Sequence, residues 1–134
     1  MQTQLPEIRV REVMSTAPVT IRHDLTLADA AERMFNHKIR HLPVTEGEHL
    51  VGMLSERDIS MIASIPTVDR TKVRVEQAMS SRPYTCGPDE PLIEVVRHMV
   101  DDKQGSVVVM QDGKVIGIVT TIDVLALTLN LLGA

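Results

Sequence analysis

The chain has 134 residues, of which 43% are hydrophobic and 24% charged, and it carries a formal net charge of −4. This length supports one compact module and excludes several independent domains. The negative charge, together with only two aromatic residues, Phe35 and Tyr84, argues against a nucleic-acid-binding surface, which needs a dense cationic footprint or base-stacking platforms.

The first half of the chain predicts a β-α-β-β-α unit, which a turn-prone stretch at 14–18 precedes. Thr26 and Asp29 form a capping box in front of apolar residues at helical spacing, which indicates a helix. Gly47 suits a tight hairpin between two apolar stretches. In chain order we predict a strand at 19–21, a helix from 26, strands at 41–44 and 50–54, and a helix from 56.

A connection follows at 62–73, where Pro66 and a charged run replace the periodic pattern. The second half then predicts the same unit, with Asp89 as a cap for its first helix and Pro91 in the first turn. Its predicted elements are a strand at 84–86, a helix from 91, strands at 106–110 and 114–119, and a helix from 121.

The final helix is too apolar for a solvated surface, so the partner repeat or a second chain must cover it. This favours a homodimer. The apolar residues of the helix are Ile122, Val124, Leu125, Leu127, Leu129, Leu131 and Leu132.

Shifting the sequence by 65 residues superposes the two halves without a gap. Between residues 10–60 and 75–125 we count 12 identities in 51 pairs, where composition alone gives about three. We therefore predict two repeats, at 8–61 and 74–130, in an α+β fold. Each repeat would form a three-stranded sheet with two helices on one side, and the repeats would pack about a pseudo-twofold axis.

Each copy carries the pattern Gly-x-x-Ser/Thr-x-x-Asp where a strand turns into a helix, at 52–58 and at 117–123. A hydroxyl at a helix start lies beside unpaired backbone N–H groups, where a phosphate oxygen is stabilised. An aspartate one turn later can accept two hydrogen bonds from ribose hydroxyls. The same residues also match a helix capping box, which binds the helix's own amides. Recurrence does not separate the two interpretations, because a duplication copies caps as well.

This two-copy pattern resembles the tandem cystathionine-β-synthase (CBS) domain pair, also called a Bateman module. The resemblance extends from residue 8 to residue 130 and includes both Gly-x-x-Ser/Thr-x-x-Asp turns. It implies adenosyl ligands, such as AMP, ADP, ATP or S-adenosylmethionine, in clefts between the paired repeats, and a homodimer. The further matching segments are Val13-Met14-Ser15, Ala78-Met79-Ser80 and Arg40-His41-Leu42-Pro43-Val44.

The resemblance also implies which residues hold the ligand. Ribose would bind Asp58 and Asp123, with phosphate near Ser55 and Thr120. Two sets of residues would surround the base, one through its backbone and one as an apolar wall. The backbone set is Thr20, Ile21, Thr85 and Cys86, and the wall is Leu42, Pro43, Val107 and Val108.

The copies differ in charge near these positions. Arg57 and the pair Arg40-His41 correspond to Ile122 and the pair Gly105-Ser106. Cationic side chains strengthen hydrogen bonds to phosphate, so we expect the first site to prefer phosphorylated ligands. The second site would be weak, empty or suited to a less charged adenosyl group. Arg57 could also simply point to water, as exposed arginines usually do.

Two functions stay open. In the first, the module senses an adenosyl ligand and signals to a partner protein by a conformational change. In the second, it is a dimerisation or scaffold module whose pockets no longer bind. We expect neither an enzyme nor a catalytic cofactor, because no acid–base pair, activated nucleophile or Walker-type loop is recognisable. His37 and His41 lack a third ligand for a metal site.

The sequence carries no signal for a membrane or for an oxidising compartment. No apolar run approaches the ~18 residues of a membrane helix, and the first residues lack the pattern of a secretory signal. Cys86 is the only cysteine, so no intrachain disulfide can form. These features predict a cytoplasmic protein.

Overall fold

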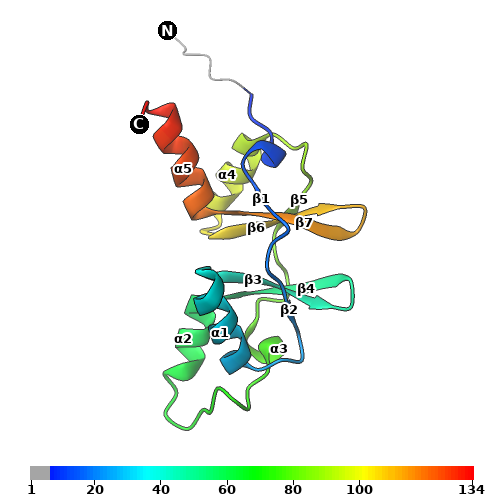
Figure 1. Ribbon diagram of the computed structural model, residues 1–134, viewed down its shortest axis with the longest axis vertical. Helices are drawn as coiled ribbons and strands as arrows, with labels where there is room; N and C mark the ends of the chain where they lie inside the picture. Colours follow the sequence, from blue (N-terminus) through cyan, green and yellow to red (C-terminus); the bar gives the residue numbers. More distant parts are fainter. Residues whose placement is uncertain (1–6) are drawn as a thin grey trace. The chain divides into compact units, whose positions relative to one another are not determined.

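The computed structural model describes residues 7–134, which divide into two compact units (Figure 1). The first-repeat unit comprises residues 18–83. The second-repeat unit combines residues 7–17 with residues 84–134. Two leading segments, 8–17 and 73–82, therefore each belong to the unit that contains the sheet and helices of the other repeat.

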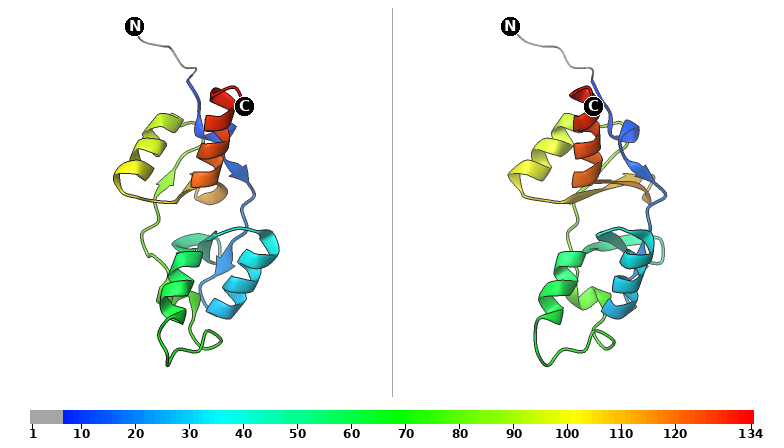
Figure 2. Two further views of the ribbon diagram at one scale, coloured as in Figure 1. Left: turned by 90° about the vertical axis from the view of Figure 1, so that its left-hand side faces the viewer. Right: turned by 60° about the vertical axis from the view of Figure 1, so that its left-hand side comes forward.

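The first-repeat unit holds a three-stranded sheet of order β2-β3-β4, in which β2 runs parallel and β4 antiparallel to β3. Both long helices lie on the same face of this sheet (Figure 2). The elements are β2 (Ile21–Arg22), α1 (Leu27–His37), β3 (His41–Glu46), β4 (His49–Ser55), α2 (Glu56–Ala63) and α3 (Val75–Ala78).

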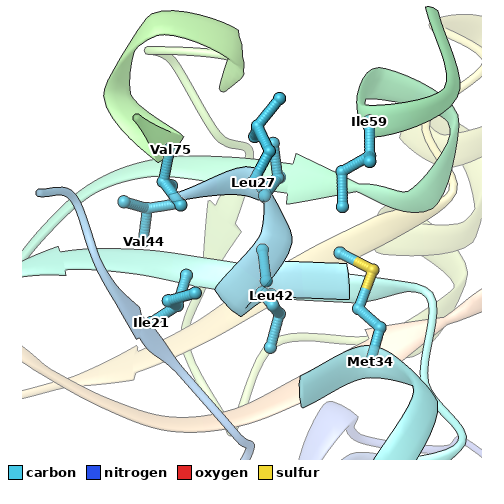
Figure 3. Packing of buried hydrophobic residues seen from close by; sticks show 9 residues of the cluster. Ile21, Leu27, Met34, Leu42, Val44, Ile59 and Val75 are labelled. Atoms are coloured by element: carbon cyan, nitrogen blue, oxygen red, sulfur yellow. The ribbon is translucent and has the colours of Figure 1, made fainter. Parts of the chain in front are cut away.

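Alternation along the strands builds the core of this unit, because every second side chain faces the helices. Leu42 and Val44 point from β3 into the same cluster as Met34 of α1 and Ile59 of α2 (Figure 3). Val75 of α3 is fully buried in it and anchors the second leading segment. The predicted capping box of α1 is present, since Thr26 Oγ1 accepts a hydrogen bond from the Asp29 amide at 3.2 Å.

The second-repeat unit has a four-stranded sheet of order β1-β7-β6-β5. The first leading segment supplies its extra strand, since β1 pairs antiparallel with β7. The elements are the 3-10 turn η1 (Val10–Glu12), β1 (Ser15–Thr16), β5 (Thr85–Cys86), α4 (Leu92–Asp101), β6 (Ser106–Gln111), β7 (Lys114–Thr120) and α5 (Thr121–Leu131).

The predicted α+β class and the duplicated β-α-β-β-α order are confirmed. Two expectations for the second repeat were wrong. Its sheet has four strands instead of three, because the first leading segment adds β1. Asp89 does not cap α4, because its carboxylate binds the Arg11 guanidinium at 2.7 Å and Pro91 occupies the cap position without a side-chain bond.

The glycine of each Gly-x-x-Ser/Thr-x-x-Asp pattern lies under a methionine of a leading segment. A Cβ atom on Gly52 would overlap the sulfur of Met79, and one on Gly117 would approach the sulfur of Met14 to 2.6 Å. The Cβ on Gly52 would also lie 2.7 Å from the Ser80 carbonyl oxygen. Only glycine lets the leading segment approach the strand this closely.

Gly52→Ala should therefore destabilise the protein by about 1–3 kcal/mol, because backbone as well as a side chain must move. Thermal unfolding followed by circular dichroism would measure the loss. Gly87→Ala is the matched control, since the nearest atom to its new Cβ lies 3.5 Å away. It should change stability by less than about 0.5 kcal/mol. Equal unfolding temperatures for the two variants would contradict the close-approach argument.

Candidate functional site

The pattern of the first repeat lies where β4 ends and α2 begins. Ser55 Oγ accepts a hydrogen bond from the Asp58 amide at 3.1 Å, and Asp58 Oδ2 accepts one from the Ser55 amide at 2.9 Å. The two residues therefore form a reciprocal capping box. The capping interpretation holds for the first copy.

The second repeat has the same arrangement at the start of α5. Asp123 Oδ2 accepts hydrogen bonds from the amide and the hydroxyl of Thr120, at 2.9 and 3.1 Å. Thr120 Oγ1 in turn faces the Asp123 amide at 3.4 Å. Both aspartates that were expected to hold ribose thus bind the start of their own helix.

Capping uses only one oxygen of each carboxylate, and an ionised carboxylate can accept about four hydrogen bonds. Asp123 Oδ1 accepts one from the Ser15 hydroxyl at 3.3 Å. Asp58 Oδ1 has no hydrogen-bond partner among residues 7–134, and neither aspartate is fully buried. Each carboxylate could therefore cap its helix and still accept a ligand hydroxyl.

The first repeat also brings a histidine to this turn. His41, the first residue of β3, lies opposite Ser55 in the antiparallel ladder. Burial lowers the pKa of His41, Asp58 opposes the shift, and the charge of Arg40 adds to it. The imidazole is therefore predominantly neutral at pH 7. A phosphate bound nearby would raise its pKa and favour the cation.

Arg40 and Arg57 are both exposed, and within the described part of the chain neither makes an ion pair. Arg40 lines a surface cavity of about 770 Å³ between α1 and α2, together with Lys38 and Arg70. None of the other expected site residues lines this cavity. The cavity also reaches Glu56, the first residue of α2, whose amide donates a hydrogen bond to the Arg40 carbonyl at 2.8 Å, so Arg40 lies beside the start of this helix.

The residues expected around the base divide between core and outer faces of the sheets. Four of them belong to the hydrophobic cores of their own units and can offer a ligand only backbone atoms: Ile21, Leu42, Cys86 and Val107. Pro43 follows Leu42 in β3, and Val108 follows Val107 in β6. Because side chains alternate along a strand, Pro43 and Val108 point to the opposite face of each sheet. Thr20 and Thr85 are partly exposed or exposed.

Sequence reasoning missed several residues beside these positions. Arg33 of α1 donates a hydrogen bond to the Thr20 carbonyl at 2.7 Å, and Ser15 binds Asp123. No pattern in the sequence marks either contact. Met14 and Met79 did carry a signal, because each recurs at the same 65-residue offset as the glycine on which it packs.

Two classes of feature are absent from residues 7–134. No group of three or more His, Cys, Asp or Glu side chains is placed to hold a metal ion. None of the helices there combines the length and the apolar character needed to cross a membrane.

A model of the CBS domain matches this chain twice, at residues 10–64 and 75–130. The chain belongs to the CBS domain family. The fold agrees with that of the CBS domain pair of protein MJ0100, whose structure was solved in complex with 5′-methylthioadenosine and S-adenosyl-L-methionine. That structure superposes with a TM-score of 0.80 at 29% identity, covering 92% of this chain and 97% of that chain.

Two relatives match this chain over very different shares of their own length. A CBS domain-containing protein of Dictyostelium discoideum is 28% identical over 137 residues, and 94% of each chain is covered. L-aspartate semialdehyde sulfurtransferase of Methanocaldococcus jannaschii is 30% identical over 122 residues, which are 89% of this chain but 23% of that enzyme. This chain spans between 14% and 23% of the length of three enzymes that it matches.

Cys86 should react slowly with thiol reagents. Burial, with a contribution from Glu90, raises the pKa of its thiol to about 12, so little of the nucleophilic thiolate exists at pH 8. We expect modification by dithiobisnitrobenzoate at pH 8 to be at least about tenfold slower in the folded chain than in urea. Equal rates in the two conditions would show that the thiol is neither buried nor shifted.

Proposed function

We propose that the chain is a regulatory module that binds adenosyl compounds and signals to a partner protein without catalysing a reaction. One observation carries the proposal. The CBS pair of MJ0100 was solved with two adenosyl compounds bound, and it is 29% identical to this chain over nearly the whole length of both. The module would act in the cytoplasm, in keeping with a single, buried Cys86.

The side chains at the two helix starts support this function. At each turn a carboxylate retains acceptor capacity beyond its cap, as ribose recognition requires. A hydroxyl and the positive end of a helix lie beside it, which suits phosphate. We propose Asp58 and Asp123 as ribose ligands and Ser55 and Thr120 as the phosphate end. The base would contact the side chains of Pro43 and Val108. It would contact six further residues through backbone only: Thr20, Ile21, Leu42, Thr85, Cys86 and Val107.

The two sites would differ in the charge that they accept. Strand pairing places Arg40 and His41 beside the start of α2, and Arg57 lies in its first turn. Their counterparts in the second repeat are uncharged. ATP, ADP or AMP would then favour the first site, and a ligand without phosphates, such as methylthioadenosine, the second. Signalling requires that the ligand bind two arrangements of the protein with different affinity, because only that difference can shift their populations.

A second candidate function, a scaffold that binds no ligand, is supported by the capping contacts. Both key carboxylates are already engaged by their helices, as expected of caps that serve stability alone. The chain would then be a dimerisation or scaffold module without a ligand. The two candidates differ in one measurable property, which is whether any adenosyl compound binds.

Binding to AMP, ATP, S-adenosylmethionine and methylthioadenosine should be measured by calorimetry and thermal shift on the wild type, Asp58→Ala and Asp123→Ala. A ligand at about 100 times its dissociation constant adds about 2.7 kcal/mol of stability. Asp58→Ala should mainly weaken the binding of ATP, and Asp123→Ala should mainly weaken the binding of methylthioadenosine.

Asp29→Ala is the matched control, because Asp29 closes the same kind of capping box on α1 but has no proposed ligand role. It should lose about 1 kcal/mol of stability, like the other two variants, and keep full ligand affinity. Failure of every adenosyl compound to bind the wild type would favour the scaffold function. An equal loss of ATP binding in both site variants would contradict the difference between the sites.

We further propose that two chains associate through α5. No residue of this helix is buried, although Val124 and Leu127 pack against the core of their unit. An apolar face of this size in water is typical of an interaction surface. The exposed large apolar side chains of α5, with that of Leu132 directly after it, are 47–77% exposed: Ile122, Leu125, Leu129, Leu131 and Leu132.

Light scattering should give twice the 14.9 kDa mass of one chain. The double variant Leu125→Glu/Leu129→Glu should shift the protein to the monomer, because it places charges in the apolar contact. Ile65→Glu, an exposed apolar position in the turn after α2, is the control and should leave the mass unchanged. A monomeric wild type at micromolar concentration would refute the association.

A further inference from the structure

The two leading segments dock through the same backbone hydrogen bonds. In the second-repeat unit, the Val10 amide donates to the Glu90 carbonyl at 3.0 Å and the Arg11 amide to the Pro88 carbonyl at 2.8 Å. The Leu92 amide donates back to the carbonyl of Ile8 at 2.8 Å. These three bonds fix the segment beside the turn that precedes α4.

The first-repeat unit repeats this arrangement at an offset of 65 residues. The Val75 amide donates to the Leu25 carbonyl at 2.7 Å and the Glu76 amide to the His23 carbonyl at 3.0 Å. The Leu27 amide donates back to the carbonyl of Val73 at 2.9 Å. Backbone hydrogen bonding therefore gives neither docking surface a preference for its own segment.

The apolar anchors do not discriminate either. Val10 and Val75 are the same residue type, and both are fully buried. Each valine joins the core of its unit under the first turn of a helix that starts with a buried leucine, Leu92 or Leu27. Either valine would fill either pocket with equal volume. Packing, like backbone hydrogen bonding, therefore gives neither docking surface a preference for one segment.

The residue after the buried valine is basic in one leading segment and acidic in the other. Arg11 binds Asp89 of the second-repeat unit at 2.7 Å, and its side chain is 47% exposed. Glu76, at the corresponding position, pairs with His23 of the first-repeat unit. The hydrogen bond to Glu76 raises the pKa of His23 and so favours its cationic form. The positive partner thus lies on the segment in one unit and on the docking surface in the other.

We propose that these two ion pairs of opposite polarity select which leading segment each docking surface accepts. The surface around Asp89 fits a segment with a basic residue after its buried valine, and the surface around His23 fits one with an acidic residue. The pairs thereby enforce the exchange in which each unit is completed by the leading segment of the other repeat.

Exchanging the segments would create unfavourable contacts. Glu76 would take the place of Arg11 beside Asp89, and two carboxylates in direct contact repel each other. Arg11 would meet His23 and Asp24, and Asp24 is already bound by Arg22 at 2.7 Å. Specificity between otherwise equivalent partners commonly rests on such repulsive contacts against the wrong one.

The charge-reversal series Arg11→Glu, Glu76→Arg and the double variant tests the proposal. In the native arrangement the two positions occupy different units and share no partner, so their effects on Tm should add. If charge selects the segment, the double variant regains two attractive pairs by exchanging its segments. We expect each single variant to lower Tm by about 2–4 °C and the double variant to lose clearly less than the sum.

Methyl NOEs provide the structural readout. In the wild type, Val75 should contact Leu27 and Val10 should contact Leu92, whereas in the double variant a second set of signals should link Val75 to Leu92. The milder pair Arg11→Gln/Glu76→Gln keeps the chain folded if the reversals do not. With no charge to select, it should also give two sets of valine signals.

The control exchanges another pair at constant net charge, Glu94→Arg/Arg97→Glu, an exposed pair 4.0 Å apart on α4. It should keep a single set of valine signals and the wild-type Tm. Two results together would overturn the proposal. The Tm losses of the charge reversals would add, and both double variants, reversed and neutral, would show only the wild-type NOEs. The outcome does not depend on whether an adenosyl ligand binds.

Discussion

The burial of two valines, Val10 and Val75, is the contact on which the rest of the structure depends. Each valine holds a leading segment in a core built by the opposite repeat. The segment then carries Met14 onto Gly117, or Met79 onto Gly52, at the strand that ends in a capping box. The candidate ligand turns are therefore positioned by residues from both halves of the chain, and neither repeat is complete alone.

Much of the fold could be predicted, because its signals are local. Short apolar stretches separated by turn residues mark β3, β4, β6 and β7, and Thr26 with Asp29 marks the start of α1. The ungapped duplication placed the same elements at the same spacing in both halves. The turns at Asp58 and Asp123 were also visible, since a short motif at a strand-to-helix junction needs no tertiary information.

What the sequence could not predict depends on long-range choices. Leu42 faces the core and its neighbour Pro43 faces away from it. The hydrophobic pattern could not predict which of the two faces inward, because this strand is apolar on both faces. Nor could it reveal that Ser15 reaches Asp123, 108 residues away. The exchange of leading segments was hidden for another reason: with Val10 and Val75 identical, either docking is equally compatible with the hydrophobic pattern.

This exchange has a consequence for synthesis on the ribosome. The first-repeat unit is a continuous stretch, 18–83, and can fold as soon as it emerges. Residues 8–17 must wait until α4 has been made, which at about 5–20 residues per second takes several seconds. Until residues 73–82 emerge, the surface that later holds Val75 is open to residues 8–17. The opposite polarity of the Arg11 and Glu76 ion pairs would work against a premature contact there, because Val10 alone fits either surface.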